Sequence, residues 1–138
     1  MINAERKRKQ RAERKGRQAE IATIWLYRLA GWHLLGTRQK TPFGEIDVIM
    51  KKRNRLKFIE VKFRASMSKS AWNQTLETIL PSPRQQQRLI KAIHLVSSHW
   101  LNRYHKSNFN PDIIIQCDIV LWNGWFNVHI KKDILETL

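Results

Sequence analysis

The sequence predicts an α/β domain in which helices pack on a mixed β-sheet. Two adjacent stretches alternate between apolar and polar residues, as half-buried strands do, and a helical repeat of apolar residues precedes them. A second helical repeat separates these strands from two further strand-like runs. The predicted order is one helix, three strands, one helix and two strands, and 138 residues is the usual length of one domain.

The N-terminal segment, residues 1–17, is strongly basic and contains eight Lys and Arg side chains. We expect it to be a solvated, partly helical tail that is suited to follow a nucleic-acid backbone. Residues 18–138 are expected to form the single folded domain.

The first predicted helix begins at about Gln18. Its apolar side chains recur at i, i+3, i+4 and i+8, at Ile21, Ile24, Trp25 and Leu29. This spacing predicts one apolar face that packs on the rest of the domain, and Gly31 is a typical residue to end such a helix.

Three strands are predicted to follow the helix. Residues 32–35 form the first, and after a turn at residues 42–44 the second and third occupy residues 45–50 and 56–63. In the second strand, Ile46 and Val48 are expected to share one face, with Glu45 and Asp47 on the other. The short connection predicts that the second and third strands pair as an antiparallel hairpin.

Residues 64–80 contain several serines and are expected to form a loop with about one turn of helix. Ser82-Pro83 is a typical N-cap and first helical residue, and the second long helix should run to about Tyr104. Its apolar side chains are Leu89, Ile93, Val96 and Leu101.

The C-terminal part is expected to contain a turn at residues 108–111, a central strand at residues 113–122 and a partner strand at residues 125–130. Asn123-Gly124, between these two strands, is a strong hairpin signal. Residues 131–138 should form a short helix or a tail.

The net charge of +15 and the pI of about 10.7 indicate a polyanionic partner. A nucleic acid, above all DNA, is the expected partner, although ribosomal RNA or an anionic membrane surface would satisfy the same charge. No stretch has the length and hydropathy of a membrane span, and no apolar segment follows the basic residues as in a secretory signal. The single cysteine excludes an internal disulfide framework. We therefore expect a cytoplasmic protein without a membrane partner.

Asp47, Glu60 and Lys62 are the residues that point to chemistry. On the predicted strands Glu60 and Lys62 project from one face, and Asp47 can lie across from them on the neighbouring strand. Two carboxylates this close repel each other unless they share a cation, and Mg²⁺ or Mn²⁺ suits their oxygens. The carbonyl of Val61 is a further candidate ligand. Such an ion activates water for phosphodiester hydrolysis, while the Lys62 ammonium orients the water and stabilises charge on the phosphate oxygens.

Other interpretations of these residues stay open. Glu60 and Lys62 would form an ordinary surface salt bridge if their strand were exposed. Glu45 is a candidate metal ligand, a supporting group or a partner for the basic tail. Glu20 would reach the site if the first helix packs beside it, and is otherwise an acid that favours the helix dipole.

Several side chains are candidate nucleic-acid contacts. Arg84, Arg88 and Lys91 recur on one side of the second long helix, where they form either a solvated face or a phosphate track. Arg64 and Trp72 follow the third strand, and Trp72 is a candidate for stacking on a base. Three other tryptophans are expected in the core: Trp25, Trp100 and Trp122. The five histidines show no metal-ligand spacing.

The stretches Gly44 to Ile49 and Phe58 to Arg64 resemble the paired signature of the YraN-like family of small bacterial proteins. The resemblance extends to Gly16, Glu20, Gly31, Ser82-Pro83, Leu89-Ile90, Ala92 and Asp118-Ile119-Val120. That family is similar to the PD-(D/E)XK nucleases, among them the archaeal Holliday-junction resolvases. The resemblance implies a restriction-endonuclease-like fold, metal-binding acids at Asp47 and Glu60, a catalytic lysine at Lys62 and a helical acid at Glu20. By analogy with the resolvases, it also implies a homodimer.

The chain departs from the family pattern at three positions. Ile46 stands where proline is usual, Gln85 where many members have a lysine, and Gln116 where an arginine is frequent. A glutamine at position 85 is able to orient water or phosphate but brings no charge. The main expectation is a metal-dependent endonuclease acting on DNA, with branched DNA as one candidate substrate. The alternatives are a nucleic-acid-binding module with little or no catalysis on the same fold, and a basic protein associated with ribosomes or membranes.

Overall fold

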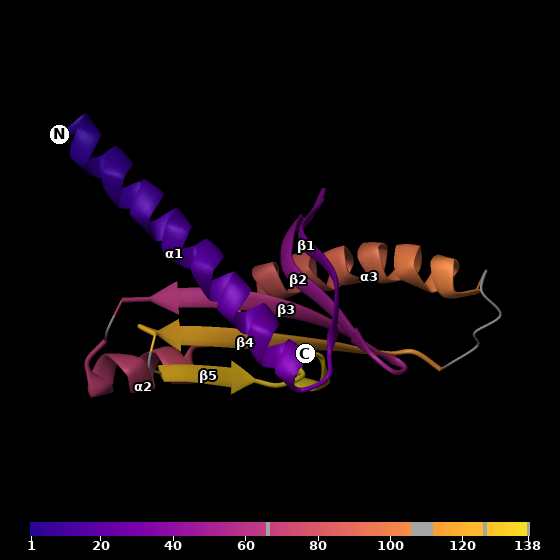
Figure 1. Cartoon of the computed structure of the whole chain (residues 1–138). Helices are drawn as coiled ribbons and strands as arrows, with labels where there is room; N and C mark the ends of the chain where they lie inside the picture. The colour runs from indigo at the N-terminus through magenta and orange to yellow at the C-terminus, as the bar shows by residue number, and fades with distance from the viewer. Residues whose placement is uncertain (66, 106–111, 126, 138) are drawn as a thin grey trace.

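The chain forms a five-stranded sheet with helices on both faces (Figure 1). This computed structural model describes residues 1–65, 67–105, 112–125 and 127–137. The strands are β1 (His33–Thr41), β2 (Gly44–Lys52), β3 (Arg55–Arg64), β4 (Ile114–Asn123) and β5 (Asn127–Lys131). The helices are α1 (Ile2–Leu29), α2 (Lys69–Glu77), α3 (Pro83–His105) and the 3₁₀ turn η1 (Ile134–Thr137). The predicted restriction-endonuclease-like class, a mixed sheet flanked by helices, is confirmed.

The strands lie in the order β1-β2-β3-β4-β5. Neighbours are antiparallel except β3 and β4, which run parallel from the pair Arg55 and Ile114 to the pair Arg64 and Asn123. A parallel pair needs a crossover, and here α2 and α3 provide it. The predicted hairpin of the second and third strands is confirmed as the antiparallel pair β2–β3.

Each face of the sheet has its own apolar core. On one face Phe58, Ile119 and Leu121 are buried with Ile93 and Val96 of α3. On the opposite face Ile24 and Tyr27 of α1 pack on the sheet together with Trp32, Val48, Ile59, Val120 and Trp122. Alternation along β3 therefore places Ile59 toward α1 and Phe58, Glu60 and Lys62 toward α3, as the sequence predicts.

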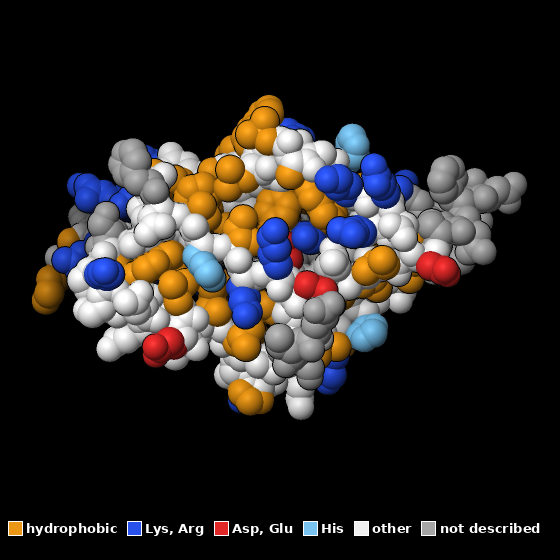
Figure 2. Space-filling view, turned by 90° about the horizontal axis from the view of Figure 1, so that it is seen from below, with side chains coloured by type: hydrophobic (Ala, Val, Ile, Leu, Met, Phe, Trp, Pro, Cys, Tyr) orange, Lys and Arg blue, Asp and Glu red, His pale blue; other side chains and the backbone are white. Residues whose placement is uncertain are grey.

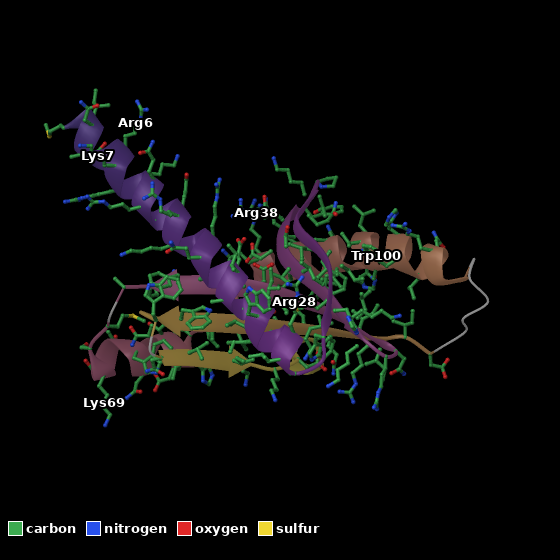
Figure 3. The ribbon with its side chains drawn as sticks, viewed as in Figure 1. Arg6, Lys7, Arg28, Arg38, Lys69 and Trp100 are labelled. Carbon is green, nitrogen blue, oxygen red and sulfur yellow. The ribbon has the colours of Figure 1, made fainter. Side chains whose placement is uncertain are left out.

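Helix α1 begins at Ile2, so the prediction that it starts at about Gln18 is wrong. The residues of the basic tail are mostly Ala, Glu, Gln, Lys and Arg, which favour helix, and Glu5–Lys9 and Glu13–Arg17 have the i, i+4 spacing of helical ion pairs. The N-terminal part of α1 extends beyond the sheet, with Arg6 and Lys7 at its far end (Figures 1 and 3). Residues 2–14 are thus the free part of a continuous helix, because Lys15 Nζ already lies 5.9 Å from the centre of the Phe63 ring on β3.

The face of α1 that packs on the sheet also differs from the prediction. Its buried residues are Ala19, Thr23, Ile24 and Tyr27. Three residues of the predicted apolar face are exposed: Ile21 (57%), Trp25 (56%) and Leu29 (84%). The helix is rotated because Thr23 and Tyr27 find polar partners on the sheet: Thr23 Oγ1 accepts a hydrogen bond from Trp122 Nε1 at 3.0 Å.

A buried polar cluster holds α1 to the centre of the sheet. The Tyr27 hydroxyl donates to Asp118 Oδ2, and Lys57 Nζ lies 3.0 Å from the same oxygen. The backbone N–H of Asp133 donates to the other oxygen at 2.9 Å. Burial raises the pKa of Tyr27 far above its usual range, so the phenol stays protonated and acts as the donor. Asp118 is fully buried, and these three contacts satisfy its charge.

Several local predictions are corrected by the structure. Residues 69–77 form a helix, α2, with Ser68 as N-cap, where the sequence suggested a loop with one turn. Ile46 and Val48 are both fully buried but pack in opposite cores. The pairing of β2 with β3 covers Val48 to Lys52 only, so the regular alternation of side chains does not continue to Ile46. Among the predicted core tryptophans, Trp122 is buried and Trp100 packs against the core, whereas Trp25 is exposed. The predicted turn at residues 108–111 lies outside the described residues.

Basic side chains are spread over the face of the molecule in Figure 2, and acidic side chains are few there. The hairpin Asn123–Asn127 and the short C-terminal helix follow the sequence prediction. None of the helices in the described part of the chain combines the length and the hydropathy that a bilayer crossing requires.

Candidate active site

The candidate site lies where β2 separates from β3. The backbone pairing of these strands runs from Lys52 and Arg55 to Val48 and Ile59. One residue further along β2, the Asp47 side chain takes over, because its Oδ2 accepts a hydrogen bond from the Val61 backbone N–H at 2.8 Å. This bond fixes the Asp47 carboxylate beside β3, next to Glu60. The sequence prediction that Asp47 lies across from Glu60 and Lys62 is therefore matched in the structure.

Glu60 and Lys62 open into a cavity of about 250 Å³ between the sheet and α3. The hairpin between β1 and β2 closes one side of it with Glu45, and α3 contributes Gln85 and Arg88. The fully buried side chains of the α3-side core lie beneath the sheet end of this cavity. Glu45 and Glu60 are thus reached by solvent through this cavity, and the basic side of α3 lies opposite them.

The Glu60 carboxyl group is the most perturbed acid of the site. Burial, together with the charge of the neighbouring Asp47, raises its pKa to about 8, and Lys62 acts in the opposite direction. Its Oε1 atom is buried and has no hydrogen-bond partner among the residues that the structure describes. A buried carboxylate oxygen without a partner is costly, and a cation is the group that would satisfy it.

Asp47 is also destabilised as an anion. Burial raises its pKa to about 6, while the hydrogen bond from Val61 lowers it. The charges of Glu20 and Glu45 raise the pKa and that of Arg38 lowers it. Glu20, Glu45, Asp47 and Glu60 therefore concentrate negative charge at one point of a protein whose net charge is +15.

Arg38 is a member of the site that the sequence did not reveal. Its Nε lies 3.1 Å from Glu20 Oε2, so the two side chains bridge β1 and α1. Arg38 is labelled in Figure 3. Its backbone has φ of 49°, in the left-handed region that side-chain-bearing residues rarely adopt. Nothing in the stretch Thr37 to Lys40 signals this conformation. Glu20 lies on α1 near enough to the site for its charge to raise the pKa of Asp47.

The residues present suit a hard divalent cation that keeps part of its water. Within the described ranges, no three His, Cys, Asp or Glu side chains group as a metal cage. Asp47, Glu60 and the backbone carbonyl of Val61 would therefore hold the ion, with water as the remaining ligands, which is the preference of Mg²⁺. The unpartnered Glu60 oxygen and the raised pKa values of both acids fit this role.

The predicted nucleic-acid contacts have different surroundings. Arg84 and Arg88 are exposed on α3, and Arg88 lines the acidic cavity. Arg64 is exposed at the end of β3, where its guanidinium donates to the Phe63 carbonyl at 3.0 Å. Trp72 is half-buried and packs against the α3-side core, which favours a structural role for this side chain over stacking on a base.

Gln85 has a structural partner at the start of α3. Its Oε1 accepts a hydrogen bond from the Ser82 backbone N–H at 3.2 Å, and Ser82 Oγ accepts one from the Gln85 N–H at 3.3 Å. These two bonds form a capping box. The Ser-x-x-Gln spacing in the sequence is the signal from which this capping box could have been predicted. Gln85 also lines the acidic cavity, so the cap sets its position at the site.

The fold and the site define an α/β protein with a buried pair of acids and a lysine at the separation of two strands. The chain belongs to the family described as "Uncharacterised protein family UPF0102", whose sequence model matches residues 19–122. This confirms the resemblance to the YraN-like family. The family match does not show membership of the nuclease superfamily, which stays part of the functional proposal.

Relatives with substantial identity come from several bacteria. A UPF0102 protein of Rhodopseudomonas palustris (strain BisA53) is 40% identical over 110 residues, which cover 80% of this chain and 74% of the relative. One from Parvibaculum lavamentivorans is 37% identical over 110 residues, covering 80% of this chain and 72% of the relative. One from Bradyrhizobium sp. (strain BTAi1 / ATCC BAA-1182) is 43% identical over 81 residues, covering 59% and 54%. The match thus spans about half the length of the Bradyrhizobium relative and more of the other two.

Proposed function

We propose that this protein is a Mg²⁺- or Mn²⁺-dependent endonuclease of the PD-(D/E)XK type that hydrolyses phosphodiester bonds in DNA. The buried, unpartnered Oε1 of Glu60 beside Asp47 carries the proposal. A structural ion pair would satisfy that oxygen, whereas a cation site leaves it free for a ligand. The neighbouring lysine and the basic face of α3 suit a phosphate that approaches this cation.

The chain's own residues have separate roles in this reaction. Asp47 and Glu60 hold the cation, which when bound supplies an activated water and neutralises charge on the phosphate oxygens. The hydrogen bond from Val61 orients the Asp47 carboxylate. Lys62 has no carboxylate within salt-bridge distance among the pairs found in the described residues, so its ammonium is available to orient water and stabilise the developing negative charge.

Substrate binding would come from the basic surface. Arg84 and Arg88 on α3 face the site entrance, and the free part of α1 adds a row of Lys and Arg side chains. Neutralised phosphates release counterions, which gives affinity without sequence preference. A DNA substrate implies a cytoplasmic protein, and a branched substrate would suit a homodimer.

A nucleic-acid-binding module without cleavage is the alternative, and one observation favours it. The side chain at the position where a further lysine would help catalysis is Gln85, which already accepts the Ser82 N–H. If the missing charge disables catalysis, the protein would still bind nucleic acid through its basic surface.

Cleavage assays distinguish these functions. Linear duplex, single-stranded and four-way-junction DNA would be incubated with Mn²⁺ or EDTA at low salt, using wild type, Asp47→Ala, Lys62→Ala and Lys69→Ala. Lys69 is the control because it is an exposed lysine of α2 that points away from the sheet (Figure 3). We expect cleavage that requires Mn²⁺, falls by about 100-fold or more in the first two variants and is unchanged in the third. Tight binding without cleavage in all four proteins would leave only the binding module.

A further inference from the structure

A groove next to the acidic cavity carries the next inference. It has a volume of about 620 Å³ and lies between the β1–β2 turn and the first turns of α3. Phe43, Gly44 and Arg88 line both this groove and the acidic cavity. A polymer in the groove would therefore reach Glu60 and Lys62 without leaving the protein surface.

The α3 wall of the groove is basic. Arg84, Arg88 and Lys91 recur at intervals of four and three residues, so their side chains lie on one side of the helix. All three are exposed, and the described side chains that line the groove include no acid. This wall suits the phosphates of a strand that runs toward the cavity.

The opposite wall presents an aromatic ring at the tip of the β1–β2 turn. Phe43 is 39% exposed, and Lys91 Nζ lies 5.7 Å from the centre of its ring. Thr41 fixes the turn, because its Oγ1 accepts the Phe43 N–H at 3.1 Å and donates to the Gly44 carbonyl at 2.6 Å. Gly44 has φ of 138°, a conformation that favours glycine. The backbone thus fixes the turn, and the ring stays partly exposed beside Lys91, outside both apolar cores of the described residues.

An exposed ring that faces cations across a groove is the arrangement that single-stranded nucleic acids bind, with bases on the ring and phosphates on the cations. Duplex DNA hides the faces of its bases in the stack, so the ring would have nothing to stack on. The groove would therefore bind unpaired nucleotides in preference to paired ones.

We propose that this groove binds an unpaired segment of DNA, with Phe43 stacked on a base and Arg84, Arg88 and Lys91 on the phosphates. The inference rests on the proposed function for the direction of the strand into the acidic cavity and for the cleavage of a bond there. It names the substrate class as single-stranded or branched DNA, in which unpaired nucleotides occur next to the bond that is cut.

Binding without cleavage tests the inference. Fluorescence anisotropy in EDTA would compare a labelled single strand of about 16 nucleotides with the duplex of the same sequence. The proteins are wild type, Phe43→Leu, Phe43→Trp and Trp25→Leu. Leucine keeps the apolar bulk but removes the ring, and tryptophan keeps a ring. Trp25 is the matched control, because it is an exposed aromatic residue of α1 away from the groove.

We expect Phe43→Leu to weaken single-strand binding about tenfold and duplex binding less than twofold, since one stacked base contributes about this factor. Phe43→Trp should bind the single strand at least as well as wild type, and Trp25→Leu should change neither. Equal losses on both DNAs, or no loss with Phe43→Leu, would overturn the inference. Because the assay contains no divalent metal, the stacking result is independent of whether wild type cleaves DNA.

Discussion

The Glu60 carboxyl group couples the stability of the metal-free protein to pH. Its pKa is about 8 in the folded chain and 4.5 as its ordinary value, which we take for the unfolded chain. Between these values the folded protein holds a proton that the unfolded chain has released, so raising the pH favours unfolding. The pKa of Asp47 moves in the same direction, from 3.8 to about 6.

We therefore expect the free energy of unfolding in EDTA to fall between about pH 5 and pH 8, by on the order of 4 kcal/mol, since each pH unit contributes about 1.4 kcal/mol for one proton. Glu60→Gln cannot ionise, so its stability should change less with pH and exceed that of wild type at pH 8. Urea titrations at several pH values measure this, with the exposed acid variant Glu77→Gln as control. Stability of wild type that rises through this window would contradict the expected environment of Glu60.

Asp118 is a structural carboxylate, although it belongs to the stretch Asp118-Ile119-Val120 that resembles the family. In Asp118→Asn the Lys57 ammonium would stay buried without an anionic partner. We expect a loss of about 3 kcal/mol in the free energy of unfolding, and about 1 kcal/mol for Tyr27→Phe, which removes one hydrogen bond. Urea unfolding is the measurement. Asp112→Asn, a change of an exposed aspartate, should leave the midpoint unchanged.

At the scale of residues, the sequence predicted those site residues whose position follows from the alternation of side chains along a strand. Glu60 and Lys62 follow from strand alternation, and Asp47 follows from the neighbouring strand. Arg38 could not be predicted, because its place depends on a left-handed backbone conformation and on the packing of α1 beside β1. The orphan oxygen of Glu60 is also a tertiary property, since it depends on what α3 and β2 leave uncovered.

At the scale of elements, strands β2 and β3 were predictable because each alternates over its whole length and a short turn joins them. The buried face of α1 was not. The apolar residues of α1 are compatible with two different buried faces. Which face is buried depends on polar partners that are distant in the sequence: Trp122 bonds Thr23, and Asp118 bonds Tyr27. Helix α2 was missed because it is short: its apolar side chains that pack on the core, Trp72 and Leu76, form only one i, i+4 pair, and neither is fully buried.

The start of α3 has a specific energetic prediction. Ser82→Ala removes the side-chain half of the capping box with Gln85 and should lower the free energy of unfolding by about 1 kcal/mol. Thermal or urea unfolding followed by circular dichroism measures it. Ser98→Ala in the middle of the same helix should cost less, because Ser98 bonds only a carbonyl of its own helix. A loss as large for Ser98→Ala would argue against a capping role for Ser82.

At the scale of the whole molecule, the free part of α1 should contribute electrostatically to DNA affinity. Replacing Arg6, Lys7, Arg8 and Lys9 with Gln removes four charges. We expect weaker duplex binding and a slope of log K against log salt that is shallower by about 0.9 for each phosphate that the segment no longer neutralises. Anisotropy titrations over a salt series measure the slope. Glu5→Gln with Glu13→Gln, which removes the acids of the same segment, should strengthen binding, and unchanged slopes would exclude the segment from the interface.

The continuity of α1 also sets a length. Residues 2–14 stand free of the sheet as part of one helix, and at 1.5 Å per residue they span about 20 Å. Because B-DNA rises about 3.4 Å per base pair, this segment laid along a duplex would reach across about six base pairs. The helix leaves the domain in one direction only, so its reach is one-sided. The protected region of a bound DNA would therefore be asymmetric about the acidic cavity. Shortening the DNA flank below about six base pairs would weaken binding on one side and not on the other.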